Sequence, residues 1–150
     1  MRFEQKEART RSAGSLLARR LVNRGAPLYT CLMFSEAVLD HFRNPRNAGS
    51  LPDATAVVEV TNPVCGDVLR LAVRLQDAHI VAARFKTQGC VAAIACSSVL
   101  TELLTGKTAA QARDISALQI SETLGGLPPA TFHAAQLCCD ALSALVSKIA

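Results

Sequence analysis

Three short segments of this chain carry side chains that could bind metal or transfer sulfur. They are NPVCGDV, TQGCVAAIA and FHAAQLCC, and their candidate ligands are Cys65, Asp67, Cys90, His133, Cys138 and Cys139. Thiolate, imidazole and carboxylate are the usual ligands of zinc, and thiolates also hold iron-sulfur clusters. The set as a whole is therefore chemically sufficient for a zinc site or a cluster site.

Each of the three segments alone is weaker evidence for a metal or cluster site than the three together. A single cysteine beside a glycine is often a small buried apolar residue, and Cys96, inside an expected helix, is interpreted as core. Cys90 differs because it stands where a strand should lead into a helix. The positive end of the helix dipole there favours the thiolate. Arg84 and Lys86, which precede Cys90, are interpreted as a solvated strand face rather than an anion site.

The six cysteines are expected to be reduced. A chain of 150 residues buries enough surface to fold without disulfides. The N-terminus lacks the apolar segment and cleavage site of a secretory signal. A reducing, cytoplasmic setting in a bacterium is expected, where clustered cysteines indicate metal or sulfur chemistry. No apolar run reaches the roughly 18 residues of a membrane span, so no membrane partner is expected.

The net charge of +4 is concentrated near the N-terminus. Residues 1–32 carry seven Arg or Lys and two Glu, whereas residues 33–150 carry nine basic and ten acidic residues. The charge of the larger part therefore gives no indication of nucleic-acid binding. We interpret 1–32 as a basic, disordered tail and 33–150 as one domain, with Met33 its boundary or true start. An organelle transit peptide is the alternative interpretation of the tail, and its two glutamates count against it.

The domain is predicted to be α+β, with a three-stranded antiparallel sheet and helices packed on it. Strands are predicted at 56–62, 68–75 and 79–87. Helices are predicted from 35 to 42, from 91 to a stop at Gly106, in two short segments capped by Thr108 and Ser116, and from Pro128 to the end.

Side-chain periodicity predicts which faces are buried. In the second strand, the alternation favours burial of Leu69, Leu71, Val73 and Leu75. In the third strand, Val81, Ala83 and Phe85 are expected opposite Ile80, Ala82 and Arg84. In the last helix, the stripe that should face the sheet is Phe132, Ala135, Cys139, Leu142, Val146 and Ile149.

From Met33 to Ala150 the chain resembles the IscU/NifU-type iron-sulfur cluster scaffold proteins. The matching segments are SEAVLDHFRNPRNAGS, PVCGDV, ARFKTQGCVAAIACSS, the GK after the helix and LPPATFH. The resemblance implies that family's sandwich fold and a scaffold rather than an enzyme. Such a protein accepts sulfur from a cysteine desulfurase, binds iron, builds a 2Fe-2S cluster and transfers it to apo-proteins or cluster carriers. Members also bind zinc when no cluster is present, and a homodimer is one assembly left open.

The resemblance also implies roles for particular residues. Cys65 and Cys90 match two of the family's three cluster-binding cysteines, and Asp67 matches the aspartate that keeps the cluster labile. His133 matches the histidine beside the third cysteine, but that cysteine's own position is occupied by Ala134. The missing residue is also the expected sulfur acceptor, so both roles are left without an obvious side chain.

Cys138 is one candidate for the missing ligand. On a helix it lies about 40° and roughly 6 Å from Ala134, whereas Cys139 lies about 140° away and is expected in the core. Either Cys138 serves as ligand or sulfur acceptor, through a shifted helix start, or it is an inert apolar residue. A second departure from the family is Thr131, which replaces a lysine of the chaperone-recognition stretch, so chaperone binding is expected to be weak or absent.

Two rival functions are kept beside the scaffold. The first is a zinc-binding sulfur acceptor that activates a desulfurase. Relatives of that kind carry an insertion before the last helix and lack the histidine, whereas this chain has His133 and no room for the insertion. The second rival is a divergent structural zinc protein that has lost assembly activity.

Overall fold

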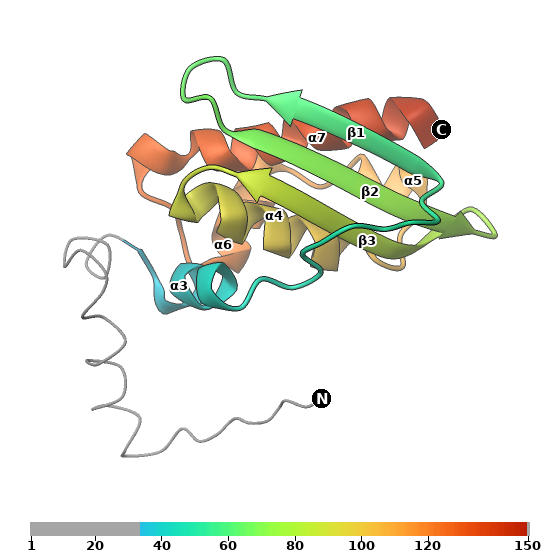
Figure 1. Cartoon of the computed structure of the whole chain (residues 1–150). Coiled ribbons are helices and arrows are strands. Elements are labelled where there is room, and N and C mark those ends of the chain that lie inside the picture. The colour runs from blue at the N-terminus through green and yellow to red at the C-terminus, as the bar shows by residue number, and fades with distance from the viewer. Residues whose placement is uncertain (1–33, 150) are drawn as a thin grey trace. The chain divides into compact units, whose positions relative to one another are not determined.

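The computed structural model describes residues 34–149 (Figure 1). The expected tail, with Cys31 and Met33, lies outside the described residues. The elements are α3 (Glu36–Arg43), β1 (Ala56–Thr61), β2 (Val68–Gln76), β3 (His79–Gln88), α4 (Val91–Leu104), α5 (Ala109–Ala112), α6 (Ala117–Thr123), the 3-10 turn η3 (Pro129–Thr131) and α7 (His133–Ile149). The predicted α+β architecture is confirmed. Among residues 34–149, no helix has the length and apolar character to cross a bilayer.

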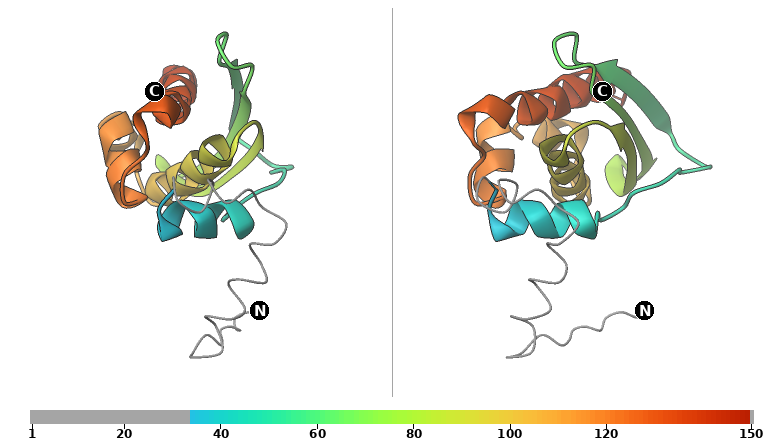
Figure 2. Two further views of the ribbon diagram at one scale, coloured as in Figure 1. Left: turned by 90° about the vertical axis from the view of Figure 1, so that its left-hand side faces the viewer. Right: turned by 60° about the vertical axis from the view of Figure 1, so that its left-hand side comes forward.

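The sheet is antiparallel with the order β1-β2-β3. Figure 2 shows the helices gathered on one face of it. The predicted alternation in β2 is confirmed where that face is covered, because Leu69, Leu71 and Val73 have no exposed surface. The opposite face of β2 carries Arg70 and Arg74, so the sheet has one apolar and one charged face.

A β-bulge changes the predicted faces of β3. Arg74 pairs with Ala82 but Leu75 pairs with Ile80, which leaves Val81 as an extra residue without a partner. An extra residue reverses the alternation beyond it. Ile80 is therefore fully buried and Val81 is 40% exposed, the reverse of the sequence-based expectation. Ala83 and Phe85 face the core as expected.

Helix α4 is the centre of the core and lies between the sheet and the other helices (Figures 1 and 2). Cys96 has no exposed surface, which confirms its interpretation as a core residue. Helix caps form where the sequence predicts them, since the side chains of Ser35, Thr108 and Ser116 each accept a backbone N–H at their helix starts.

The last helix begins later than the prolines predict. Pro129–Thr131 form the separate turn η3, and Phe132 N–H bonds to Pro129 O. Ala135 and Gln136 then donate to Phe132 O, so α7 starts at His133. The turn places His133 at the first position of α7, where its side chain projects beyond the helix end.

The turn of the β2–β3 hairpin supplies a test of its backbone conformation. Its two central residues, Asp77 and Ala78, both have left-handed backbones, with φ of 54° and 66°. Because alanine is disfavoured there, we expect Ala78→Gly to raise the free energy of unfolding by about 0.5–1 kcal/mol. In the control Ala82→Gly, within β3, glycine only adds entropy to the unfolded chain and should lower stability. Urea unfolding of both variants checks this, and equal destabilisation would contradict the turn conformation.

Candidate metal centre

Asp67 is the central side chain of the site. It directly precedes β2 and is only 7% exposed. Its carboxylate packs against Gly89, where a Cβ would lie 2.6 Å from Asp67 Cγ. Only glycine fits such an approach, so Gly89 lets the carboxylate lie directly beside the start of α4. Asp67 thereby joins the two cysteine-bearing segments.

The loop between β1 and β2 presents Cys65 to solvent. Asn62 organises this loop, because its Oδ1 accepts from Val64 N at 2.8 Å and from Cys65 N at 3.4 Å. Its backbone N donates to Asp67 O and its backbone O accepts from Gly66 N, both at 2.8 Å. Gly66 has a φ of 76°, which favours glycine. Sequence reasoning missed Asn62, although asparagine beside proline is a turn signal.

Cys65, Asp67 and His133 form a potential metal-binding group. One donor atom from each lies within 4.8 Å of the others. His133 Nε2 is 3.9 Å from Asp67 Oδ2, and His133 Nδ1 is 3.1 Å from Ala130 O in η3. A carbonyl can only accept, so Nδ1 carries the proton and Nε2 is left as the ligand atom. The turn before α7 thus orients the imidazole.

Cys90 joins this group through Asp67. It caps the N-terminus of α4, and its Sγ lies 3.6 Å from Asp67 Oδ2. Burial raises the pKa of the Cys90 thiol, and the Asp67 carboxylate raises it further, against the lowering effect of the Ala93 and Ala92 backbone N–H groups. The N-terminus of α4 thus favours the thiolate as expected, but in the metal-free protein burial and the carboxylate outweigh it and the pKa of Cys90 is raised overall.

The separations fit a single metal ion. Zinc bonds of about 2.0–2.3 Å in a tetrahedron imply ligand atoms roughly 3.3–3.8 Å apart. The distances from Asp67 Oδ2 to Cys90 Sγ, 3.6 Å, and to His133 Nε2, 3.9 Å, are close to that range. Two thiols, one carboxylate and one imidazole are also a chemically suitable set. Cys90 is close to Asp67 but lies outside the group of three donor atoms within 4.8 Å, so binding by all four residues requires Cys90 to move towards Cys65 and His133.

The structure does not bring Cys138 to these residues. Cys138 has no exposed surface, and its Sγ lies 4.0 Å from Ser97 Oγ. Ser97 donates its one hydroxyl proton to Ala93 O and accepts from Thr87 Oγ1, so the Cys138 S–H is the donor to Ser97. Burial above all raises the pKa of Cys138 well above its ordinary value. This arrangement favours the interpretation of Cys138 as a core thiol.

The expected order of burial within the thiol pair is reversed. Cys139, expected in the core, is half-buried and borders a cavity of about 300 Å³ with Leu142 and Val146. Helix α7 packs against α4 and the sheet at once, so its fully buried stripe runs through Ala134, Cys138, Ala141 and Leu145. The stripe that Cys138 shares with Ala134 therefore faces the core and not the site.

Comparison with known proteins gives matches over the part of the chain that contains the site. The family model described as the NifU-like N-terminal domain matches residues 33–150. The IscU iron-sulfur cluster assembly scaffold proteins of Archaeoglobus fulgidus are 46% identical over 110 residues, which is 73% of this chain and 72% of theirs. The IscU scaffold protein of Escherichia coli K12 is 42% identical over 120 residues, 77% of this chain and 93% of its own.

Solved structures share the fold. A candidate scaffold protein for the SUF system from Fervidobacterium islandicum has a TM-score of 0.62 at 22% identity, covering 77% of this chain and 97% of its own. A NifU-like N-terminal protein from Brucella abortus has a TM-score of 0.61 at 20% identity, covering 78% and 94%. At these identities the likeness concerns the fold alone. Together with the sequence matches, it shows that this chain belongs to the NifU-like N-terminal domain family.

Proposed function

We propose that this protein is a scaffold on which an iron-sulfur cluster is assembled, with Cys65, Asp67, Cys90 and His133 as ligands of that cargo. The observation that carries the proposal is their convergence from three separate segments: the β1–β2 loop, the start of α4 and the start of α7. The IscU relatives, which are named iron-sulfur cluster assembly scaffold proteins, support it. The proposed cargo is a 2Fe-2S cluster, in which four protein ligands complete the coordination of two irons bridged by sulfide.

Access to the two thiols fits delivery and removal of the cargo. Cys65 and Cys90 are both exposed, whereas Cys138 is buried. Sulfur arrives from a cysteine desulfurase that carries a persulfide. A thiolate of this chain attacks the outer sulfur, so a new S–S bond forms as the old one breaks, and the desulfurase thiol is released. We assign this attack to Cys65, because its thiol is exposed on the β1–β2 loop, whereas burial of the sulfur and the neighbouring Asp67 carboxylate disfavour the thiolate of Cys90.

Asp67 makes the bound cluster exchangeable. A carboxylate is a harder ligand than a thiolate and a poorer partner for a cluster. Asp67 lies beside both Cys90 and His133, at the centre of the site. Its carboxylate therefore competes with the neighbouring ligands for the iron of the cluster. Transfer to apo-proteins or cluster carriers in a bacterial cytoplasm then needs only exposed acceptor thiols. Thr131 stands in place of the family's lysine, so we expect little help from the dedicated chaperone.

A zinc-binding sulfur acceptor that activates a desulfurase is the second candidate. The near-tetrahedral separations around Asp67 Oδ2 favour it, because they suit one cation as well as a cluster edge. A structural zinc protein without assembly activity would use the same four residues. The candidates differ in whether iron and sulfide are retained, and in whether sulfur is received.

Reconstitution separates these functions. Protein incubated anaerobically with iron, cysteine, a desulfurase and a thiol reductant, which reduces the persulfide sulfur to sulfide, should show a visible charge-transfer spectrum and about two irons per cluster. Cys138→Ser should keep the cluster, because Cys138 lies in the core, whereas Cys65→Ser should lose it. Circular dichroism confirms that both variants are folded. Tightly held zinc with no visible spectrum would contradict the scaffold, and loss of the cluster in folded Cys138→Ser would contradict the assigned ligand set.

The role of Asp67 predicts a more persistent cluster after its removal. Asp67→Ala should lengthen the lifetime of the reconstituted cluster in air severalfold, because the exchangeable ligand is gone. The decay of visible absorbance measures this, with Asp140→Ala, an exposed carboxylate on α7, as the control. If the cluster in Asp67→Ala decays at the same rate as in the parent protein, Asp67 is not the ligand that makes the cluster exchangeable.

The carboxylate also predicts how Cys90 titrates. Asp67→Asn removes a negative charge beside Cys90, so the thiolate is less disfavoured and the pKa of Cys90 should fall towards its ordinary value. Burial remains, so only part of the elevation should disappear. The pH dependence of alkylation, read by mass spectrometry of the Cys90 peptide in metal-stripped protein, checks this. Asp140→Asn, whose carboxylate raises the pKa of Cys139, should change Cys139 and leave Cys90 unaltered.

A further inference from the structure

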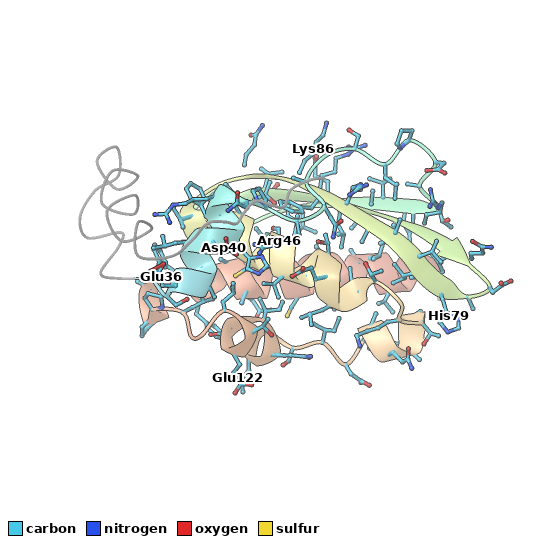
Figure 3. The ribbon with its side chains drawn as sticks, turned by 90° about the horizontal axis from the view of Figure 1, so that it is seen from below. Glu36, Asp40, Arg46, His79, Lys86 and Glu122 are labelled. Carbon is cyan, nitrogen blue, oxygen red and sulfur yellow. The ribbon has the colours of Figure 1, made fainter. Side chains whose placement is uncertain are left out.

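The charged face of the sheet contains a cavity that the metal centre does not use. It has a volume of about 240 Å³ and lies between β2, β3 and the segment Gly49–Pro52 that leads to β1. Arg70, Arg84 and Lys86 line it. Figure 3 shows Lys86 on the side of the sheet that faces away from the helices. Three cationic side chains thus border one small cavity.

Two of these cations lie directly opposite each other. Arg70 on β2 pairs in register with Lys86 on β3. Like charges at directly opposite positions destabilise a sheet. Among residues 34–149, the carboxylate paired with Arg70 is Glu59, whose Oε2 lies 4.0 Å from Arg70 Nη1, and more than half of each side chain is exposed. An exposed pair at that distance contributes little, so Glu59 does not neutralise Arg70.

Arg84 and Lys86, the remaining cations of the cavity, are not neutralised by a carboxylate among residues 34–149. Arg84 Nη1 donates to Asn47 Oδ1 at 3.1 Å, and Asn47 Nδ2 donates to Thr101 Oγ1 at 3.2 Å. A neutral amide fixes the guanidinium without neutralising it. Within residues 34–149, the side-chain ammonium group of Lys86 forms no hydrogen bond or ion pair. Its ammonium group is therefore available to a ligand.

The floor of the cavity includes a residue with little exposed surface. Ala72 lies on this charged face, is only 7% exposed, and lines the cavity together with the Gly49–Pro52 segment. A little-exposed floor lowers the local dielectric and strengthens electrostatic attraction at the cationic rim. The volume exceeds the roughly 30 Å³ of one water but is below the 300–1,000 Å³ of sites for drug-sized ligands. A small ion of several atoms is the size that fits.

From the three cations, the cross-strand repulsion and the cavity's size, we propose that Arg70, Arg84 and Lys86 bind a small multivalent oxyanion, a phosphate or a polycarboxylate. The arginine guanidinium donates paired N–H groups to such oxygens, and the lysine adds a point charge. This site shares no residue with the metal centre. The interpretation of Arg84 and Lys86 as a merely solvated strand face is replaced by this proposal.

Calorimetric titration of the full-length, metal-stripped protein tests the site. Sodium phosphate and sodium citrate are titrated separately at constant ionic strength, with sodium chloride as the control for screening. At least one of the two oxyanions should bind saturably, and the better of them identifies the source as phosphate or carboxylate. Absence of saturable binding by both would overturn the proposal.

Matched variants locate the binding. Lys86→Gln should weaken the affinity by about tenfold, as expected for the loss of one charge-assisted contact. Arg74→Gln removes a cation from the same face that is paired with Asp53 at 2.8 Å and does not line the cavity, so it should leave the affinity unchanged. Equal affinities in Lys86→Gln and the parent would overturn the proposal. Zinc binding should be the same in both variants, which separates this site from the metal centre.

Discussion

The close packing of Asp67 against Gly89 is the contact on which the site depends. Val68 pairs with Gln88, so Asp67 and Gly89 are the next residues beyond the last pair of the β2–β3 hairpin. The bulge at Val81 sets this register, because without it the two strands would be offset by one residue at the site end. A distant irregularity in the hairpin thus decides which side chain faces the start of α4, and both cysteine-bearing segments meet there.

The sheet and most helices could be predicted from local patterns, since alternation in β2 and the caps at Ser35 and Ser116 are signals carried by neighbouring residues. The exposure of Val81 could not be predicted in this way, because a bulge is a property of the pairing between two strands. The reversal of Cys138 and Cys139 has a similar cause: one apolar stripe predicts one buried face, whereas α7 is buried on two sides. Of the site, the four proposed ligands could be named from residue type and resemblance. The asparagine-proline pair at Asn62 indicates a turn, but it does not show that Asn62 Oδ1 accepts from the N–H groups of Val64 and Cys65.

The family resemblance implies a third cysteine where this chain has Ala134, and its replacement affects the chemistry of the proposed site. With Ala134 and Cys138 both on the buried stripe, α7 contributes an imidazole and no thiol. A site with two thiolates carries less negative charge than one with three, and it offers a cluster fewer soft ligands. In the proposed function, weak retention suits a carrier that must release its cargo, and the exposed Cys65 is the thiol assigned to receive sulfur.

The ligand set itself is the most direct test of this account. X-ray absorption at the zinc edge of the zinc-loaded protein counts sulfur and lighter ligands by their distances, about 2.3 Å for sulfur and 2.0–2.2 Å for nitrogen or oxygen. Cys65, Cys90, Asp67 and His133 predict two sulfurs and two lighter ligands. Three sulfurs would show that Cys138 or Cys139 reaches the metal, and would contradict the placement of the last helix.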